Sequence, residues 1–140
     1  MAKPLLAIVV PVHNETDNLA RFHEEVSRVM HDLGEYDWEF VFVDDGSTDG
    51  SLEVIQTLRD LDSRVTAIRF PRNFGSHVAI AAGIDHAKGD AAVIMAADLQ
   101  DPPSLIKDFV GRWRAGFDVV WGARSGRDDG KMRAWAMNRF

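Results

Sequence analysis

The sequence contains no cysteine. Disulfide bonds and thiolate metal sites are therefore excluded, and a reducing compartment is compatible with the chain. The sequence also lacks the roughly 20 consecutive apolar residues that a membrane-spanning helix needs. Its longest apolar runs, at 5–10 and 91–97, have the length of buried strands. The segment before the first run is too short for a signal peptide. These absences predict a soluble, cytoplasmic domain.

Basic residues are also in the minority. The 16 Lys and Arg residues against 22 Asp and Glu residues give a net charge of -6, which argues against a general nucleic-acid-binding protein. The chain is 46% hydrophobic and 27% charged, as is typical of a globular protein. Its 140 residues suffice for one domain with a core and are too few for two. We therefore expect a single domain over residues 1–140.

Apolar runs and helical patterns alternate along the chain. Continuous apolar runs indicate strands buried on both faces, and apolar residues at helical spacing indicate amphipathic helices. The alternation predicts a three-layer α/β/α fold with a mostly parallel, Rossmann-like, doubly wound sheet, whose ligands bind at the carboxyl ends of the strands. The expected strands are 5–10, 38–43, 64–70, 91–96 and 118–122, and the expected helices are 19–33 (with Gly34 as C-cap), a helix around 52–58, 78–87, 102–116 and 132–140.

The last of these helices has no cap and no closing strand after it. It starts at Met132 and is still amphipathic when the sequence stops at Phe140. We therefore expect the chain to be the N-terminal portion of a longer protein, and the exposed final helix favours self-association.

The loop after the first strand, PVHNE at 11–15, holds polar side chains but no glycine. A dinucleotide-binding Rossmann domain needs a Gly-rich turn at this place, so that interpretation is disfavoured. The segment instead offers a rigid turn with donors and acceptors that suit a base or a ribose. The alternative is an ordinary strand-to-helix turn with Asn14 or Thr16 as the helix cap.

The second loop, VDDGSTDGS at 43–51, is rich in carboxylates. Asp44 or Asp45, at the carboxyl end of a strand, can accept hydrogen bonds from a base N–H or from ribose hydroxyls. The loop also matches the start of a calcium-binding EF-hand. Its twelfth position is Gln56 instead of a bidentate Glu and a strand precedes it, so calcium binding is disfavoured. Asp49 is better explained as the cap of the helix that follows.

The third loop, ADLQDPP at 97–103, follows a strand directly. Magnesium or manganese needs only one or two protein carboxylates when phosphate and water complete its coordination. Asp98, with Gln100 as a neutral oxygen ligand, could therefore hold a diphosphate-bridging ion. Ala96 stands where a second carboxylate would complete an Asp-x-Asp pair. Asp101 is predicted to cap the helix that begins at the two prolines.

The last loop, GARSGRDDGK, carries Arg124, Arg127 and Lys131 to the same edge of the sheet. Guanidinium groups suit phosphate oxygens, although three basic residues beside two aspartates also describe a solvated surface loop. No Ser-His-Asp order or nucleophile elbow supports hydrolase chemistry. Three histidines without metal-ligand spacing are expected to be surface or internally bonded residues: His23, His77 and His86.

Taken together, PVHNE, VDDGSTDGS, RNFGSHVAIAAGIDHAKGD, ADLQDPP and GARSGR occur in the same order in family 2 glycosyltransferases of the GT-A fold. Over essentially its whole length the chain resembles the branch that contains dolichol-phosphate mannose synthase and bacterial polyprenyl-phosphate sugar transferases. The resemblance implies metal-assisted, inverting transfer of a sugar from a UDP- or GDP-sugar to a polyprenyl or dolichyl phosphate, with Mg2+ or Mn2+ as cofactor. It also implies cell-envelope chemistry at the cytoplasmic face of a membrane, with further helices after the present sequence.

The resemblance implies roles for single residues as well. Asp98 and Gln100 match metal ligands, and Asp98, Arg124 and Arg127 match the catalytic positions near the phosphates. The positions that contact the nucleotide are matched by Pro11, His13, Glu15, Val43, Asp45 and Ala97.

Two other functions stay open. A nucleotide-binding module without catalysis is favoured by Ala96, which removes half of the usual metal clamp. A transferase with a saccharide hydroxyl as acceptor would need a general base beyond Phe140. A nucleotidyltransferase would instead need a basic, Gly-rich loop after the first strand, and the sequence has none.

Overall fold

A computed structural model of the chain describes residues 2–124 and 132–137. The chain divides into two compact units, Met1–Gln100 and Asp101–Phe140, and the single domain expected from the sequence stays a prediction. The first unit contains β1 (Leu5–Val12), α1 (Leu19–Leu33), β2 (Asp37–Asp44), α2 (Ser51–Leu61), β3 (Val65–Arg69), α3 (Ser76–His86) and β4 (Ala91–Ile94). The second contains α4 (Leu105–Arg114), β5 (Val119–Arg124) and β6 (Met132–Met137).

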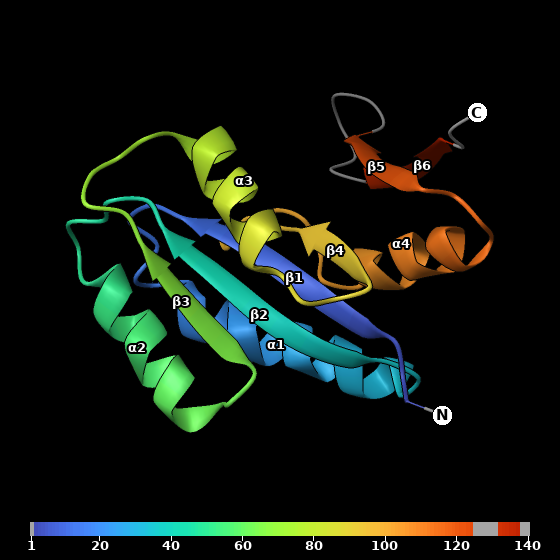
Figure 1. Ribbon diagram of the computed structural model, residues 1–140, viewed down its shortest axis with the longest axis horizontal. Coiled ribbons are helices and arrows are strands. Elements are labelled where there is room, and N and C mark those ends of the chain that lie inside the picture. The colour runs from blue at the N-terminus through green and yellow to red at the C-terminus, as the bar shows by residue number, and fades with distance from the viewer. Residues whose placement is uncertain (1, 125–131, 138–140) are drawn as a thin grey trace. The chain divides into compact units, whose positions relative to one another are not determined.

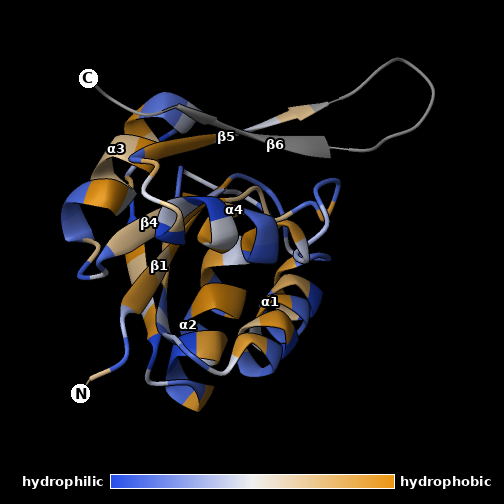
Figure 2. Cartoon of the chain, turned by 90° about the vertical axis from the view of Figure 1, so that its right-hand side faces the viewer, coloured by the Kyte–Doolittle hydropathy of each residue, from blue (hydrophilic) through white to orange (hydrophobic). Residues whose placement is uncertain are grey.

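The first unit is built around a parallel sheet with the strand order β3-β2-β1-β4. The chain moves outward from β1 to β3 and then returns past β1 to β4, so the sheet is doubly wound. In Figures 1 and 2, α1 and α2 lie on one face of the sheet and α3 lies on the other. The predicted three-layer α/β fold with a mostly parallel sheet is confirmed.

Both faces of the sheet are apolar because a helix layer covers each of them. On the face of α3, Val9, Val41 and Val43 form a fully buried cluster with Ala79. On the other face the rings of Phe40 and Phe42 stack with centroids 5.6 Å apart, and Phe22 of α1 meets Phe42 edge-on. Figure 2 shows β1 as almost wholly hydrophobic and α1 as alternately hydrophobic and hydrophilic. Such strands read as continuous apolar runs in the sequence.

The first helix ends as its sequence predicts. Gly34 adopts a left-handed conformation with φ 63°, and its N–H donates to the carbonyl of Met30. This is the usual conformation of a glycine that follows the last helical turn. None of the helices in the described part of the chain has the length and apolar character needed to cross a membrane.

The predicted helix over 132–140 is wrong where the structure describes it. Residues Met132–Met137 form β6, which pairs antiparallel with β5 and places Trp121 opposite Trp135. Met, Arg and Ala are good helix formers, but a ladder of hydrogen bonds to a neighbouring strand overrides this local preference. The local pattern therefore indicated the wrong element.

The predicted helix cap at Asp101 is also wrong. Helix α4 begins at Leu105, and its N-cap residue is Ser104. A residue before proline is disfavoured in the helical conformation, so two successive prolines delay the helix. Their carbonyls instead accept short-range hydrogen bonds, from Leu105 N–H to Pro102 and from Ile106 N–H to Pro103. The helix buries Leu105, Ile106 and Val110, as its spacing predicts.

Candidate functional site

The carboxyl ends of β2, β1 and β4 bring the first three polar loops to one edge of the sheet. Pro11 and Val43 are register partners on β1 and β2, and the Asp45 N–H donates to the Val12 carbonyl at 2.8 Å. Val43 is 0% exposed, so it lies beneath this edge and presents no surface to a ligand. The structure thus brings the first two predicted nucleotide-binding loops together.

Asn14 ties the first loop to the second. Its backbone N–H donates to the Ser47 hydroxyl at 2.9 Å, and its side-chain oxygen accepts the Thr48 N–H at 2.8 Å. Its φ of 54° lies in the left-handed region, which asparagine tolerates better than most residues. Asn14 therefore joins loops and does not cap α1, whose N-cap residue is Asn18.

Asp49 makes a second tie between the same loops. Its carboxylate accepts the Thr16 N–H at 3.2 Å, the Ser51 N–H at 3.0 Å and the Ser51 hydroxyl at 2.6 Å. The Ser51 hydroxyl is the strongest of these donors and, with those from Thr16, holds the pKa of the exposed Asp49 carboxyl well below its usual range. Asp49 thus binds the first N–H of α2, as predicted, although the N-cap residue itself is Gly50.

Glu15 is half-buried and already engaged. Its carboxylate accepts the side-chain N–H of Asn18 at 2.8 Å, and its backbone N–H donates to the Ser51 hydroxyl at 2.8 Å. A carboxylate has several lone-pair positions, so one oxygen stays available for a ribose or base donor. The structure is compatible with the predicted contact of Glu15 with a nucleotide.

His13 stands exposed at the same edge. Its Nδ1 lies 2.9 Å from the backbone carbonyl of Asp45, which can only accept, so Nδ1 carries the proton. In the neutral ring, Nε2 is then an acceptor, and the side-chain nitrogen of Asn14 lies 3.4 Å from it. The first loop therefore presents a ring whose tautomer is set by the second loop.

The carboxylate of Asp45 points to a third loop. It accepts the N–H of Phe74 at 2.7 Å and the N–H of Gly75 at 3.1 Å, and the residue is only 3% exposed. Asp44, which is 2% exposed, accepts the N–H of Ser47 at 3.3 Å. Both carboxylates are thus engaged by backbone N–H groups of the chain itself.

The turn after β4 carries the predicted metal ligands. Ala97 is buried, Asp98 is half-buried and Leu99 adopts φ 62°. The Gln100 N–H donates to Oδ1 of Asp98 at 3.1 Å, and no other hydrogen bond reaches this carboxylate from the described part of the chain. Within the described residues, no three His, Cys, Asp or Glu gather into a complete metal site. Any ion here would take most of its ligands from phosphate and water.

The predicted basic positions lie in the second unit. Arg124 is the last residue of β5, and Arg127 lies outside the described residues. The histidine prediction is confirmed for His23 and His86, which bond to Asp62 and to the Ala82 carbonyl, each through one ring nitrogen. His77 is exposed, as expected.

Sequence reasoning gave no part in the site to the loop that Asp45 binds. Phe74 and Gly75 stand between β3 and α3, about thirty residues further along the chain, and Gly46 packs against the same loop. Gly46 and Gly75 adopt positive φ angles of 68° and 100°. Glycine tolerates this conformation, but a glycine in a loop sequence does not by itself show that the conformation is used. No local pattern identifies which distant N–H groups a carboxylate will bind.

Comparison with known proteins gives one consistent family. The family model described as glycosyl transferase family 2 matches residues 7–140. An uncharacterized glycosyltransferase of Bacillus subtilis, YkcC, is 43% identical over 86% of this chain and 37% of its own length. The bactoprenol glucosyl transferase of Shigella phage SfV is 40% identical over 91% of this chain and 42% of its own length. The chain therefore spans well under half the length of these relatives.

Solved structures agree on the fold. A mannosyltransferase of Pyrobaculum calidifontis, PcManGT, determined in complex with GDP-Man and Mn2+, aligns with 69% of this chain and 28% of its own at a TM-score of 0.61 and 23% identity. TarS of S. aureus in complex with UDP aligns with 81% of this chain and 32% of its own at a TM-score of 0.53 and 20% identity. At such identities the likeness establishes the fold alone. The family match rests on the sequence, and by it this chain belongs to glycosyl transferase family 2.

Proposed function

We propose that this chain is the nucleotide-sugar-binding part of an inverting glycosyltransferase that moves a hexose from a UDP- or GDP-sugar to a polyprenyl phosphate. One observation carries the proposal: the edge of the sheet joins the polar loops 11–18 and 44–51 through hydrogen bonds and sets the Asp98 turn at the end of a nearby strand. The bactoprenol glucosyl transferases among the relatives, at 40% identity, support a polyprenyl-phosphate acceptor.

The donor nucleotide is assigned to the first two loops. His13 offers an exposed ring with an acceptor nitrogen, and Glu15 keeps acceptor capacity beside it. Pro11 shapes the floor of the site, and the buried Val43 supports it from the neighbouring strand. Asp45 is assigned to the base and ribose region through the loop that its carboxylate binds. Ala97 is small and only 1% exposed, and we assign the diphosphate to the backbone of the Asp98 turn that follows it.

A divalent ion fits the donor set of this turn. Asp98 supplies a half-buried carboxylate and Gln100 an amide oxygen, which is enough for Mg2+ or Mn2+ when diphosphate oxygens and water complete the shell. An ion held there would neutralise charge that develops on a leaving nucleoside diphosphate. The Asp98 carboxylate is oriented by the hydrogen bond from the Gln100 N–H, and the left-handed conformation of Leu99 shapes the turn between them.

The acceptor is assigned to the basic positions Arg124 and Arg127. In the reaction, the bond from the anomeric carbon to the donor diphosphate breaks, and a bond from that carbon to an acceptor phosphate oxygen forms on the opposite face. A phosphate is already ionised at neutral pH, so no strong general base is required. Guanidinium groups would orient the acceptor for in-line attack. Because a lipid acceptor lies in a membrane, the transfer would take place at a membrane surface. We assign it to the cytoplasmic face.

Calorimetric titration of the 140-residue chain tests the proposal. UDP, GDP, UDP-glucose and GDP-mannose are each titrated with and without manganese, into the natural chain and into Asp98→Ala. We expect binding that selects one base, strengthens with manganese and loses that increment in the variant. Absence of binding to every nucleotide would refute the donor assignment for this chain.

A nucleotide-binding module without catalysis is the second candidate. Ala96 favours it, because an exposed alanine stands where a second carboxylate would complete the metal pair. This candidate predicts base-selective binding that manganese leaves unchanged. The same titration therefore separates the two functions.

A further inference from the structure

The loop between β3 and α3 is seated on the second polar loop. The Phe70 N–H donates to the Asp44 carbonyl at 2.8 Å, and the N–H groups of Phe74 and Gly75 then converge on the Asp45 carboxylate. Hydrogen bonds from backbone N–H groups to a charged carboxylate are stronger than those to neutral acceptors. Because Asp45 is almost fully buried, its carboxylate depends on these N–H groups for its hydrogen bonds.

Gly46 provides a second, independent contact between the same loops. A Cβ atom built on Gly46 would lie 2.4 Å from the carbonyl carbon of Arg72 and 2.4 Å from the nitrogen of Asn73. Real Cβ atoms essentially never come so close to backbone atoms. The absence of a side chain at Gly46 is therefore what lets segment 72–75 lie against the second loop.

Asp45 joins this segment to the first loop as well. Its carbonyl accepts a hydrogen bond from Nδ1 of His13 at 2.9 Å, while both of its carboxylate oxygens accept hydrogen bonds from segment 72–75. One buried residue thus connects three loops at the edge of the sheet. The backbone carbonyl of Asp45 therefore positions the His13 ring, and its carboxylate positions segment 72–75.

We propose that Asp45 and Gly46 are positioning residues that hold segment 72–75 as a third wall of the nucleotide site. The inference rests on the proposed function for the identity of the ligand, and on the contacts above for the wall itself. The wall presents the exposed ring of Phe74 with the guanidinium carbon of Arg72 4.4 Å from its centroid. Asp45 then serves nucleotide binding through this segment rather than through direct contact with a base.

The structural half of the proposal is tested without any ligand. Amide hydrogen exchange, measured by NMR on the 140-residue chain, follows Phe74 and Gly75 in Asp45→Asn and Gly46→Ala. An asparagine keeps only one acceptor oxygen, and an alanine at position 46 displaces the segment. We expect exchange at Phe74 and Gly75 to accelerate at least about tenfold in both variants. Unchanged exchange in both would overturn the proposal.

Gly50→Ala is the matched control. Gly50 stands in the same loop with a larger positive φ of 95°, but its added Cβ would meet only a Glu53 side-chain oxygen at 3.8 Å. Backbone strain is therefore at least as large in Gly50→Ala as in Gly46→Ala, whose φ is 68°, and only Gly46→Ala collides with segment 72–75. Equal acceleration in both variants would attribute the effect to strain and contradict the positioning role.

Nucleotide titration tests the functional half. If Asp45 acts through the segment, Gly46→Ala raises the Kd of the preferred nucleotide by about tenfold or more, as Asp45→Asn does, while Gly50→Ala changes it by about twofold or less. A loss of binding confined to Asp45→Asn would show direct contact and overturn the inference. If the natural chain binds no nucleotide, the proposed function fails, whereas the exchange data still decide whether Asp45 and Gly46 position the segment.

Discussion

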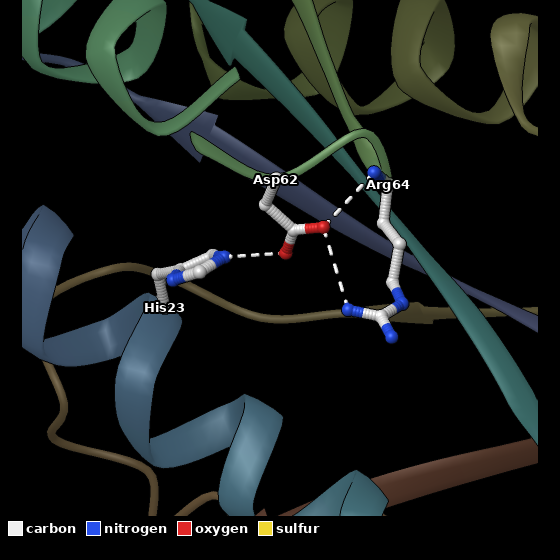
Figure 3. A network of polar contacts seen from close by, with 3 residues as sticks. All are labelled: His23, Asp62 and Arg64. Atoms are coloured by element: carbon white, nitrogen blue, oxygen red, sulfur yellow. Dashed lines mark hydrogen bonds and ion pairs between the residues drawn. The ribbon is translucent and has the colours of Figure 1, made fainter. Parts of the chain in front are cut away.

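Nε2 of His23 lies 2.8 Å from Oδ2 of Asp62, and this contact joins α1 to the end of α2 (Figure 3). The other carboxylate oxygen accepts the backbone N–H of Arg64 at 3.0 Å and lies 3.4 Å from its guanidinium. The Arg64 guanidinium lies 4.2 Å from the centroid of the Trp38 ring, and the His23 ring lies 4.9 Å from that of Phe40. A single carboxylate thus ties two helices and the start of β3 together, on the amino-terminal side of the sheet.

Stability at acid pH is expected to depend on Asp62. Burial raises the pKa of its carboxyl, but the hydrogen bonds from the Arg64 N–H and from His23 outweigh this effect and the pKa is lowered. A carboxyl whose folded pKa lies below the unfolded value of about 3.9 stabilises the fold above that pH and stops doing so as pH falls through the folded pKa. Urea unfolding should therefore show a free energy that declines below about pH 4.

Asp62→Asn should flatten that decline and lower the free energy of unfolding at neutral pH by about 1–2 kcal/mol. The control is Asp60→Asn, which removes the same charge from an exposed residue two positions earlier, in the last turn of α2. If both variants keep the same pH profile as the natural chain, the contact with His23 does not contribute to acid stability.

Asp49→Ala should destabilise the first unit by roughly 1 kcal/mol, because it removes the acceptor for the first N–H of α2 and the tie to Thr16. Thermal unfolding followed by circular dichroism measures the change. Asp17→Ala is the comparison, since Asp17 is an exposed aspartate in the first loop. Equal effects of the two substitutions would contradict the capping role.

Gly83→Ala should destabilise the protein by about 1–3 kcal/mol through overpacking. A Cβ on Gly83 would lie 2.4 Å from a methyl carbon of Val9 and 3.3 Å from one of Val43, where α3 rests on the sheet. Gly111→Ala supplies the opposite case, because Gly111 is also helical and nothing lies within 4 Å of its added Cβ. That variant should be stabilised by roughly 0.5–1 kcal/mol. Denaturant midpoints that move in the same direction for both would refute the packing argument.

The parallel core could be predicted from the sequence because the apolar runs of its central strands fit only one kind of element. The side chains of the apolar runs in β1 and β2 are buried on both faces of the sheet. Such runs do not show the spacing of an amphipathic helix, so the sequence indicates only a strand. The second unit is different. Met132–Met137 has a composition that favours a helix, and its antiparallel pairing with β5 is a tertiary effect that no local pattern contains.

The candidate site could be predicted only as far as its loops. Parallel strands bring their carboxyl ends to one edge, so the first and second loops had to meet. Which groups bond across that edge depends on chain geometry instead. Asp45 reads as an exposed ligand in the sequence, yet its carboxylate is buried against Phe74 and Gly75.

Ala96→Asp should create the carboxylate that the turn after β4 lacks. Ala96 is exposed and stands two residues before Asp98, so a carboxylate introduced there meets solvent and has room to turn toward the same ion. We expect manganese to bind at least about tenfold more tightly in the presence of UDP or GDP, because a second carboxylate adds a charged ligand. Titration of Mn2+ into the natural chain and the variant measures this. Ala92→Asp carries the same charge on an exposed position of β4 away from the turn, and should leave the Mn2+ affinity unchanged. An equal gain in both variants would mean that net charge, and not coordination beside Asp98, attracts the ion.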